Sequence, residues 1–267
     1  MAPAAMLRAS WADTYARRAW GLTAVADAPA STLTTTLSNG TARAWPEVRV
    51  TLPLPPGWTA TPTGPTAAAS LAPGRALTTT WRVSAPTTAP ALLTPQASTS
   101  SPFRFTAPTR FTPLPAPPTK DSHLSDLPWV PATNGWGPVE IDRSNGKQGA
   151  GDGTPIAFGG VTCPKGLGVH APSEIVCHLG GRASRFTALV GIDDFSTHQS
   201  PAGATRAVVR ADGRTLLTTA TLTGAGGPTA IDLDVSGVRL LHVLVEDANA
   251  RSSFDHTSWA RPYVTLT

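Results

Sequence analysis

Aromatic, imidazole and carboxylate side chains gather in the second half of the chain, in segments rich in turn-forming residues. The set is Trp136, His170, Asp193, Asp255, His256 and Trp259. A sugar presents apolar C–H faces and hydroxyl groups that both donate and accept hydrogen bonds, so its site needs an aromatic plate with imidazole, amide or carboxylate groups on rigid loops. These residue types predict a sugar site in which Trp136 or Trp259 stacks on the ring and the polar side chains bind its hydroxyls.

Structural roles are open for several of these side chains. Trp129 and Trp259 lie near the start and the last strand of the second half, where a tryptophan can simply close the core. His170 follows the Gly-broken sequence GLGV, so it can be exposed at a strand end or buried with its hydrogen bonds satisfied. Asp193 and Asp194 can cap a hairpin, and as neighbours in a strand only one of them faces a given ligand.

The two cysteines, Cys163 and Cys177, flank a turn-rich segment. Two thiols without a C-x-x-C pair do not make a zinc site of the usual spacing. They predict one disulfide in an oxidising compartment, with two buried free thiols as the alternative.

The chain lacks the patterns of a catalytic domain. The first 120 residues hold only three acidic side chains, and the acidic pairs of the second half lie in strands that split them between faces or align them on one surface. No G-x-S-x-G, H-E-x-x-H or P-loop occurs. The sequence therefore predicts a binding protein and not an enzyme.

Short strands must position the second-half residues. Alternating apolar residues predict strands at about 185–191, 204–211, 214–220, 229–235 and 238–246. Asp212-Gly213 is typical of a tight hairpin turn between two of them. Many short strands with turns between them predict a jelly-roll β-sandwich over residues 121–267.

The first half has the same all-β character in a smaller form. Alternation at 33–37, 48–54 and 77–83, with Asn39-Gly40 and two Pro-Gly pairs at turns, predicts an immunoglobulin-like antiparallel sandwich over 28–105. Prolines between 106 and 120 predict a stiff extended linker. Residues 1–27 are expected to be a frayed segment, with a short amphipathic helix as the alternative.

Charge and hydropathy exclude two kinds of partner. The net charge of +4 combines +7 in residues 1–120, from ten basic and three acidic residues, with −3 in residues 121–267. The basic residues are scattered without interleaved aromatics, so no nucleic-acid surface is expected. No apolar run is long enough to span a membrane. The start of the chain has no apolar signal-peptide core, so the protein is either cytoplasmic or a fragment of a longer exported protein.

Ordered motifs in the second half resemble the NPCBM family, the carbohydrate-binding module also described for glycosyl hydrolase family 98. The segments are LSDLPW (124–129), NGWGPVE (134–140), GDG (151–153), KGLGVHAPS (165–173), GIDD (191–194), ADG (211–213), IDLDVSG (231–237) and DHTSWA (255–260). The resemblance implies a galactose-binding-like jelly roll, a galactosyl glycan as ligand and a structural calcium ion. Asp152 and Asp255 are the carboxylates expected to contribute to calcium binding.

The first half resembles the NPCBM-associated immunoglobulin-like domain of α-galactosidases. TLSNGT, VRVTLPLPPGW, LAPG and WRVSAP carry this resemblance. It implies an upstream catalytic domain, with this chain as a non-catalytic accessory part of a secreted glycoside hydrolase.

Two loops depart from the family pattern, at 195–204 and 249–251. They leave open an alternative in which the protein is a structural or surface-display β-sandwich without a working sugar site.

Overall fold

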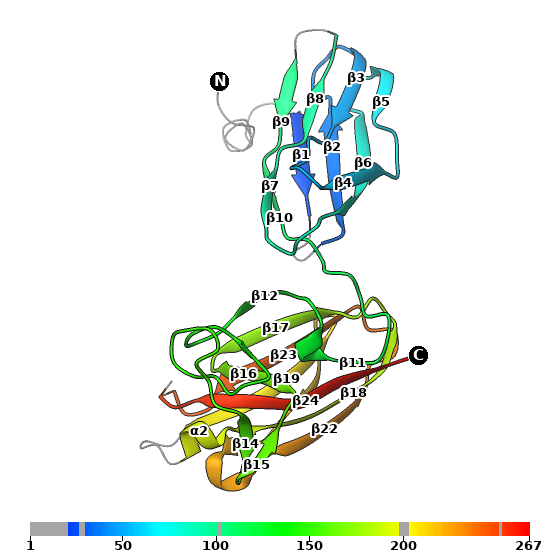
Figure 1. Ribbon diagram of the computed structural model, residues 1–267. Coiled ribbons are helices and arrows are strands. Elements are labelled where there is room, and N and C mark those ends of the chain that lie inside the picture. The colour runs from blue at the N-terminus through cyan, green and yellow to red at the C-terminus, as the bar shows by residue number, and fades with distance from the viewer. Residues whose placement is uncertain (1–20, 27–29, 101–102, 198–202, 251–252) are drawn as a thin grey trace. The chain divides into compact units, whose positions relative to one another are not determined.

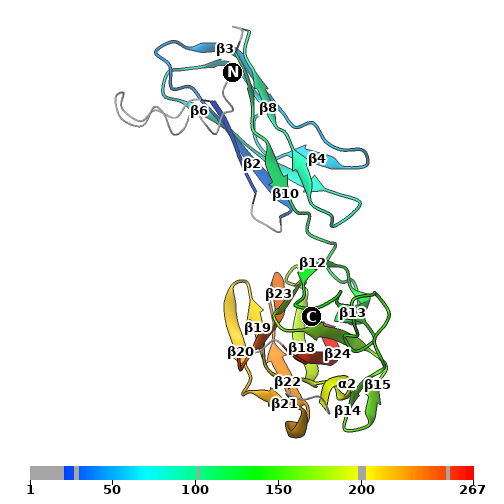
Figure 2. The same ribbon diagram turned by 90° about the vertical axis from the view of Figure 1, so that its left-hand side faces the viewer.

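The computed structural model describes residues 21–26, 30–100, 103–197, 203–250 and 253–267. The chain forms two compact units, Met1–Leu114 and Pro115–Thr267 (Figures 1 and 2). Among the described residues, no helix has the length and apolar character needed to cross a membrane.

The first unit is a two-sheet antiparallel sandwich. Its strands are β1 (Gly21–Val25), β2 (Thr32–Ser38), β3 (Trp45–Thr51), β4 (Thr59–Pro62), β5 (Ala67–Leu71), β6 (Ala76–Ser84), β7 (Ala91–Leu93), β8 (Gln96–Ser98), β9 (Arg104–Thr106) and β10 (Thr109–Phe111). One sheet has the order β1-β2-β6-β4, the other has the order β5-β3-β8-β9, and β10 pairs with β7. The all-β prediction for this half is confirmed.

Alternation along the strands builds the core of this unit. In β2, Leu33 and Leu37 are fully buried, and in β3 Val48 and Val50 are almost so. Together with Trp81 of β6 they belong to one apolar cluster, so both sheets turn their apolar sides towards each other.

The boundaries of the first unit are wider than the sequence predicts. β1 already pairs with β2 from Gly21, inside the segment 1–27 that was expected to be frayed. At the other end β10 pairs with β7 inside the expected linker 106–120. Backbone pairing with distant strands makes β1 and β10 part of the first unit, and the spacing of prolines in the sequence does not reveal such pairing. The possible helix falls mainly on residues 1–20, outside the described part of the chain.

The second unit is a larger sandwich (Figure 1). Its elements are β11 (Ser122–His123), η1 (Leu124–Asp126), β12 (Trp129–Thr133), β13 (Glu140–Ile141), β14 (Ile156–Phe158), β15 (Val161–Cys163), β16 (Gly166–His170), β17 (Ser173–His178), β18 (Ala183–Ile192), α2 (Asp194–Thr197), β19 (Ala204–Ala211), β20 (Arg214–Thr218), β21 (Leu222–Thr223), η2 (Gly224–Gly226), β22 (Thr229–Asp234), β23 (Leu240–Asp247) and β24 (His256–Leu266). The predicted strands match β18, β19, β20, β22 and β23.

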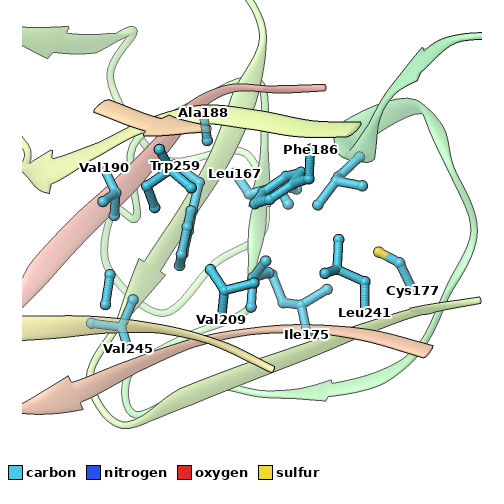
Figure 3. Close-up of a cluster of buried hydrophobic side chains, with 14 of the residues drawn as sticks. Leu167, Ile175, Cys177, Phe186, Ala188, Val190, Val209, Leu241, Val245 and Trp259 are labelled. Atoms are coloured by element: carbon cyan, nitrogen blue, oxygen red, sulfur yellow. The ribbon is translucent and has the colours of Figure 1, made fainter. Parts of the chain in front are cut away.

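Two sheets make up this sandwich. One has the order β13-β16-β24-β18-β22, and the other has the order β12-β17-β23-β19-β20. The turn predicted between β19 and β20 is present, with positive φ at Asp212 and Gly213. Figure 3 shows the core between the sheets: Phe186 and Trp259 project from one sheet towards Ile175 and Leu241 of the other. The jelly-roll prediction is confirmed.

One side of the sandwich is crossed by a short loop. β12 and β13 are the edge strands of the two sheets on this side, and residues 134–139 connect them. The next strands inward, β16 and β17, are joined by Ala171 and Pro172 alone. The loop 134–139 therefore lies beside the end of β16, where His170 stands.

Candidate functional site

Two histidines meet where β16 ends and β24 begins. The strands are antiparallel, and their register places His170 directly opposite His256. Their ring centroids are 4.8 Å apart with the planes nearly perpendicular. Each side chain is largely buried, with 5% of His170 and 7% of His256 exposed. The sheet therefore brings together two imidazoles that lie far apart in the sequence.

A third ring joins them from the short helix α2, which follows β18. The Phe195 ring lies 5.0 Å from that of His256 in an edge-to-face arrangement. Asp193 fixes this helix, because its carboxylate accepts a hydrogen bond from the backbone N–H of Phe195 at 3.0 Å. The carboxylate of Asp194 accepts hydrogen bonds from the N–H groups of Gly159 and Gly160, which ties the β14–β15 turn to α2.

Asn145 connects His256 to the loop that carries Trp136. Its amide nitrogen donates to the carbonyl oxygens of Trp136 and Pro138, both at 3.0 Å. Its Oδ1 accepts a hydrogen bond from Nδ1 of His256 at 2.9 Å. Asn145 is fully buried. A Cβ at Gly168 would lie 2.3 Å from the backbone nitrogen of Asn145, so this close approach requires glycine.

Asn134 makes a matching connection to His170. Its Oδ1 accepts a hydrogen bond from the backbone N–H of His170 at 2.8 Å, and its Nδ2 donates to the Trp136 carbonyl oxygen at 2.7 Å. The N–H of Gly135 donates to the His170 carbonyl oxygen at 3.0 Å. A Cβ at Gly135 would lie 2.2 Å from the Ala171 oxygen, so only glycine allows the loop to approach β16 this closely.

The two asparagines connect the backbone of Trp136 to the histidine strands, and the Trp136 ring is accessible. Trp136 is 44% exposed, which is unusual for so large an apolar side chain. Both asparagines bind its carbonyl oxygen, so the backbone at this position is fixed while the indole remains at the surface. An exposed aromatic on a fixed loop is suited to stacking on a ligand.

The hydrogen bonds also define which nitrogen of each imidazole carries the proton. The Ala171 carbonyl, 2.8 Å from Nδ1 of His170, can only accept. The Asn145 amide nitrogen faces two carbonyls, so its oxygen faces His256 and must accept from Nδ1 of that ring. In both neutral rings Nε2 is therefore an acceptor, and it has no hydrogen-bond partner among the described residues.

Burial keeps these rings neutral near pH 7. It lowers the pKa of His170, and it lowers the pKa of His256 to about 4, with a smaller contribution from the neighbouring His170. The site thus combines two adjacent uncharged acceptors with an exposed indole on the loop that Asn134 and Asn145 bind. Such a surface accepts hydrogen bonds from neutral hydroxyl groups.

Trp259 does not belong to this surface, which corrects the prediction that it could stack on a sugar. It is fully buried between the two sheets and lies 6.5 Å from Phe186, ring centre to ring centre. Thr257 and Trp259 point into the sandwich, where the Thr257 hydroxyl bonds to that of Thr205 in the other sheet, while His256 and Ser258 lie on the opposite face of β24. A one-residue difference in a strand reverses the face.

Asp193 and Asp255 were also predicted to bind sugar, and both are fully buried. The Asp193 carboxylate accepts hydrogen bonds from the N–H groups of Phe195 and Ala157 and from the Ser258 hydroxyl. Asp255 accepts one from the N–H of Ala204 at 2.9 Å. These carboxylates organise the loops, and neither reaches a ligand at the surface.

The predicted disulfide is absent, because Cys163 and Cys177 are free buried thiols. Cys163 lies in β15 and packs with Ile156 and Phe158, whereas Cys177 lies in β17 within the main core. The two strands belong to different sheets. Burial raises the pKa of the Cys177 thiol to about 12.

The two carboxylates expected to bind calcium, Asp152 and Asp255, differ in their hydrogen-bond partners. Both oxygens of Asp152 accept backbone hydrogen bonds, from Lys147 at 2.8 Å and from Gly149 at 3.0 Å, so this side chain organises its own loop and does not fit a metal site. Asp255 fits better: its Oδ2 is buried without a hydrogen-bond partner, and burial raises its pKa to about 6. Within the described ranges, no group of three or more His, Cys, Asp or Glu side chains is placed to hold a metal.

Sequence reasoning missed Asn134, Asn145 and Phe195. Asn134 lies in the quoted motif NGWGPVE, where the close glycines are a signal for backbone packing. Asn145 stands in SNG and looks like an ordinary turn residue. Phe195 falls in the loop that departs from the family pattern. Only the folded sheet shows that all three contact the histidine pair or the strand that carries it.

Comparisons with known proteins agree with this architecture. The NPCBM/NEW2 domain matches residues 120–265, and the NPCBM-associated, NEW3 domain of alpha-galactosidase matches residues 25–100. A protein of Renibacterium salmoninarum, named "Putative endo-alpha-N-acetylgalactosaminidase", is 36% identical over 239 residues. The match covers 86% of this chain and 16% of that protein.

Solved structures of similar sandwiches come from Clostridium perfringens. CBM51 from GH95, in complex with methyl-galactose, is 27% identical with a TM-score of 0.49, over 54% of this chain and 99% of that one. CBM51-2 with the INT domains of ZmpB, in complex with GlcNAc, is 24% identical with a TM-score of 0.50, over 66% and 37% of the two chains.

The fold and the family match define the class: the second unit is a non-catalytic carbohydrate-binding module of the β-sandwich type. The chain belongs to the NPCBM/NEW2 family, whose match covers more than half of it. The NPCBM-associated domain precedes the module, as the sequence motifs predict.

Proposed function

We propose that the second unit binds a neutral sugar of the galactose type at the surface formed by Trp136, His170 and His256. The observation that carries the proposal is the pair of Nε2 acceptors on two adjacent neutral imidazoles beside an exposed indole. Two hydroxyl groups of one ring donate to the two nitrogens, and an apolar C–H face of the ring packs against Trp136. The family resemblance supports galactose as the sugar.

The affinity for a single sugar is expected to be weak, on the order of 10⁻⁴ to 10⁻⁵ M, because hydroxyl groups exchange hydrogen bonds with water for similar ones with protein. Useful binding then comes from attachment to a catalytic domain that is already near its glycan, or from several modules. We therefore place the chain in a secreted glycoside hydrolase as its non-catalytic part. The similarity to the Renibacterium salmoninarum protein supports this placement.

Titration of methyl-galactose into the whole chain tests the site. His170→Ala should abolish measurable binding. The matched control is His242→Ala, because His242 is a partly buried histidine of β23, in the other sheet from His170, where it binds Glu174 of the neighbouring strand β17. Equal binding by wild type and His170→Ala would contradict the proposed site. No binding of any sugar from a glycan array by the wild type would favour a structural protein.

Calcium binding at Asp255 is a second proposal. An oxygen-coordinated divalent cation would supply the missing partner of its buried Oδ2 and stabilise the charged carboxylate. Asp152 is not part of this proposal, since both of its oxygens bind backbone N–H groups. Melting curves with calcium and with a chelator test it, and identical curves would refute it.

A further inference from the structure

A groove is lined by β12 and by residues of the loop 134–139, which also carries Trp136. It is an open groove of about 560 Å³ on the side of the sandwich where β12 and β13 are the edge strands. Its lining includes Trp129, Thr133, Asn134, Pro138 and Val139. This volume lies within the range of small-ligand sites in proteins.

The lining is neutral and partly aromatic. Trp129 is half-buried: it packs against the core and also lines the groove. Pro138 and Val139 add apolar surface, and Thr133 with Asn134 adds a hydroxyl and an amide. None of the described lining residues is charged. An indole wall with uncharged hydrogen-bonding groups fits a sugar ring and gives no counter-charge for an ionic ligand.

Asn134 connects the groove to the strand that carries His170. Asn134 lines the groove, and its Oδ1 accepts the hydrogen bond from the backbone N–H of His170 at 2.8 Å. The next residue, Gly135, donates to the His170 carbonyl oxygen at 3.0 Å. Asn134 thus lines the groove and also binds the backbone of the strand that carries His170.

We propose that this groove is a second sugar subsite, which takes the ring linked glycosidically to the one held by His170 and His256. This inference rests on the proposed function of the histidine site. With this subsite, the module recognises the end of an oligosaccharide and not only a single galactose. The second ring packs against Trp129, and its hydroxyls bond to the exposed hydroxyl of Thr133.

The experiment compares methyl-galactose with three galactose-terminated disaccharides: lactose, N-acetyllactosamine and melibiose. Each is titrated into the whole chain as wild type, Trp129→Ala and Thr133→Arg. Trp129→Ala removes the aromatic wall, and Thr133→Arg fills the groove from an exposed strand position without touching the core. Thr215→Arg is the matched control, because Thr215 is an exposed strand threonine on β20, the opposite edge of the same sheet.

For the wild type we expect at least one disaccharide to bind about tenfold more tightly than methyl-galactose, equivalent to about 1.4 kcal/mol. Trp129→Ala and Thr133→Arg should lose the tighter binding of the disaccharide and keep the wild-type affinity for methyl-galactose. Thr215→Arg should bind both the disaccharide and methyl-galactose as the wild type does. Melting curves show that each variant is folded, and Thr133→Arg decides the question if Trp129→Ala is not.

Two results would overturn the subsite: no gain for any of the three disaccharides, or a full gain retained in Thr133→Arg. Failure of the histidine site looks different. In that case methyl-galactose binding is absent from the wild type or unchanged in His170→Ala.

Discussion

Asn145→Ala is the substitution that best tests whether the site is built as described. It removes an amide that makes three hydrogen bonds, two to carbonyl oxygens and one to His256. A net contribution of about 1 kcal/mol for each hydrogen bond gives a decrease of about 3 kcal/mol in the free energy of unfolding. Asn134 also donates to the Trp136 and Pro138 carbonyls, so these groups keep a partner, and the expected loss is about 2 kcal/mol.

The substitution should weaken sugar binding by more than the loss of folding stability alone would cause. Without Asn145, Nδ1 of His256 has no acceptor, so the proton is free to reside on Nε2 and this nitrogen no longer accepts a hydroxyl. The Trp136 loop also loses its connection to His256, while Asn134 still connects it to the backbone of His170. We expect methyl-galactose affinity to fall at least about tenfold, the equivalent of one hydrogen bond, measured by calorimetric titration.

Asn39→Ala is the matched control. Asn39 is a buried asparagine in the first unit whose amide nitrogen also donates to two carbonyl oxygens, those of Arg43 and Leu71. It should destabilise the first unit by a similar amount in chemical denaturation and leave sugar affinity unchanged. Wild-type affinity in Asn145→Ala would refute the positioning argument. An equal loss of affinity in Asn39→Ala would show that the effect is not local.

Three further outcomes are expected. Sugar binding should weaken at low pH with a midpoint near pH 4, because protonated His256 cannot accept a hydrogen bond. The folded pKa of His256 lies below its usual value, so the free energy of unfolding should also decrease as the pH falls from about 6.5 to about 4. Affinity that stays constant between about pH 6.5 and pH 4 would contradict the binding prediction. In chelator, Asp255→Asn should stabilise the protein by about 1 kcal/mol above pH 6, after allowance for solvent screening. The raised folded pKa of Asp255 means that this gain disappears below about pH 4, and a gain independent of pH in denaturation curves would count against it. Cys163 and Cys177 should react with a thiol reagent only on unfolding, and rapid labelling of both in native protein would be inconsistent with their burial.

The sequence determines the fold class and the domain order because periodicity is a local property. Leu33 and Leu37 alternate with threonines, and Asp212-Gly213 supplies the positive φ that a tight turn needs, so strands and hairpins can be predicted from neighbours in the chain. The ordered motifs of the second half likewise predict the family. The ends of the first unit differ from the predicted boundaries because β1 and β10 form only by pairing with strands elsewhere in the sequence.

Tertiary structure alone decides which of the candidate side chains reach a ligand. His256 and Trp259 stand three positions apart on one strand, and this odd spacing places His256 on the outer face of the sheet and Trp259 in the core. The carboxylate of Asp193 has the chemistry to bind a sugar, yet its folded neighbours occupy it with protein donors. Residue type states what a side chain is able to bond, whereas its face, burial and partners are fixed by pairings between distant strands, which a local pattern does not contain.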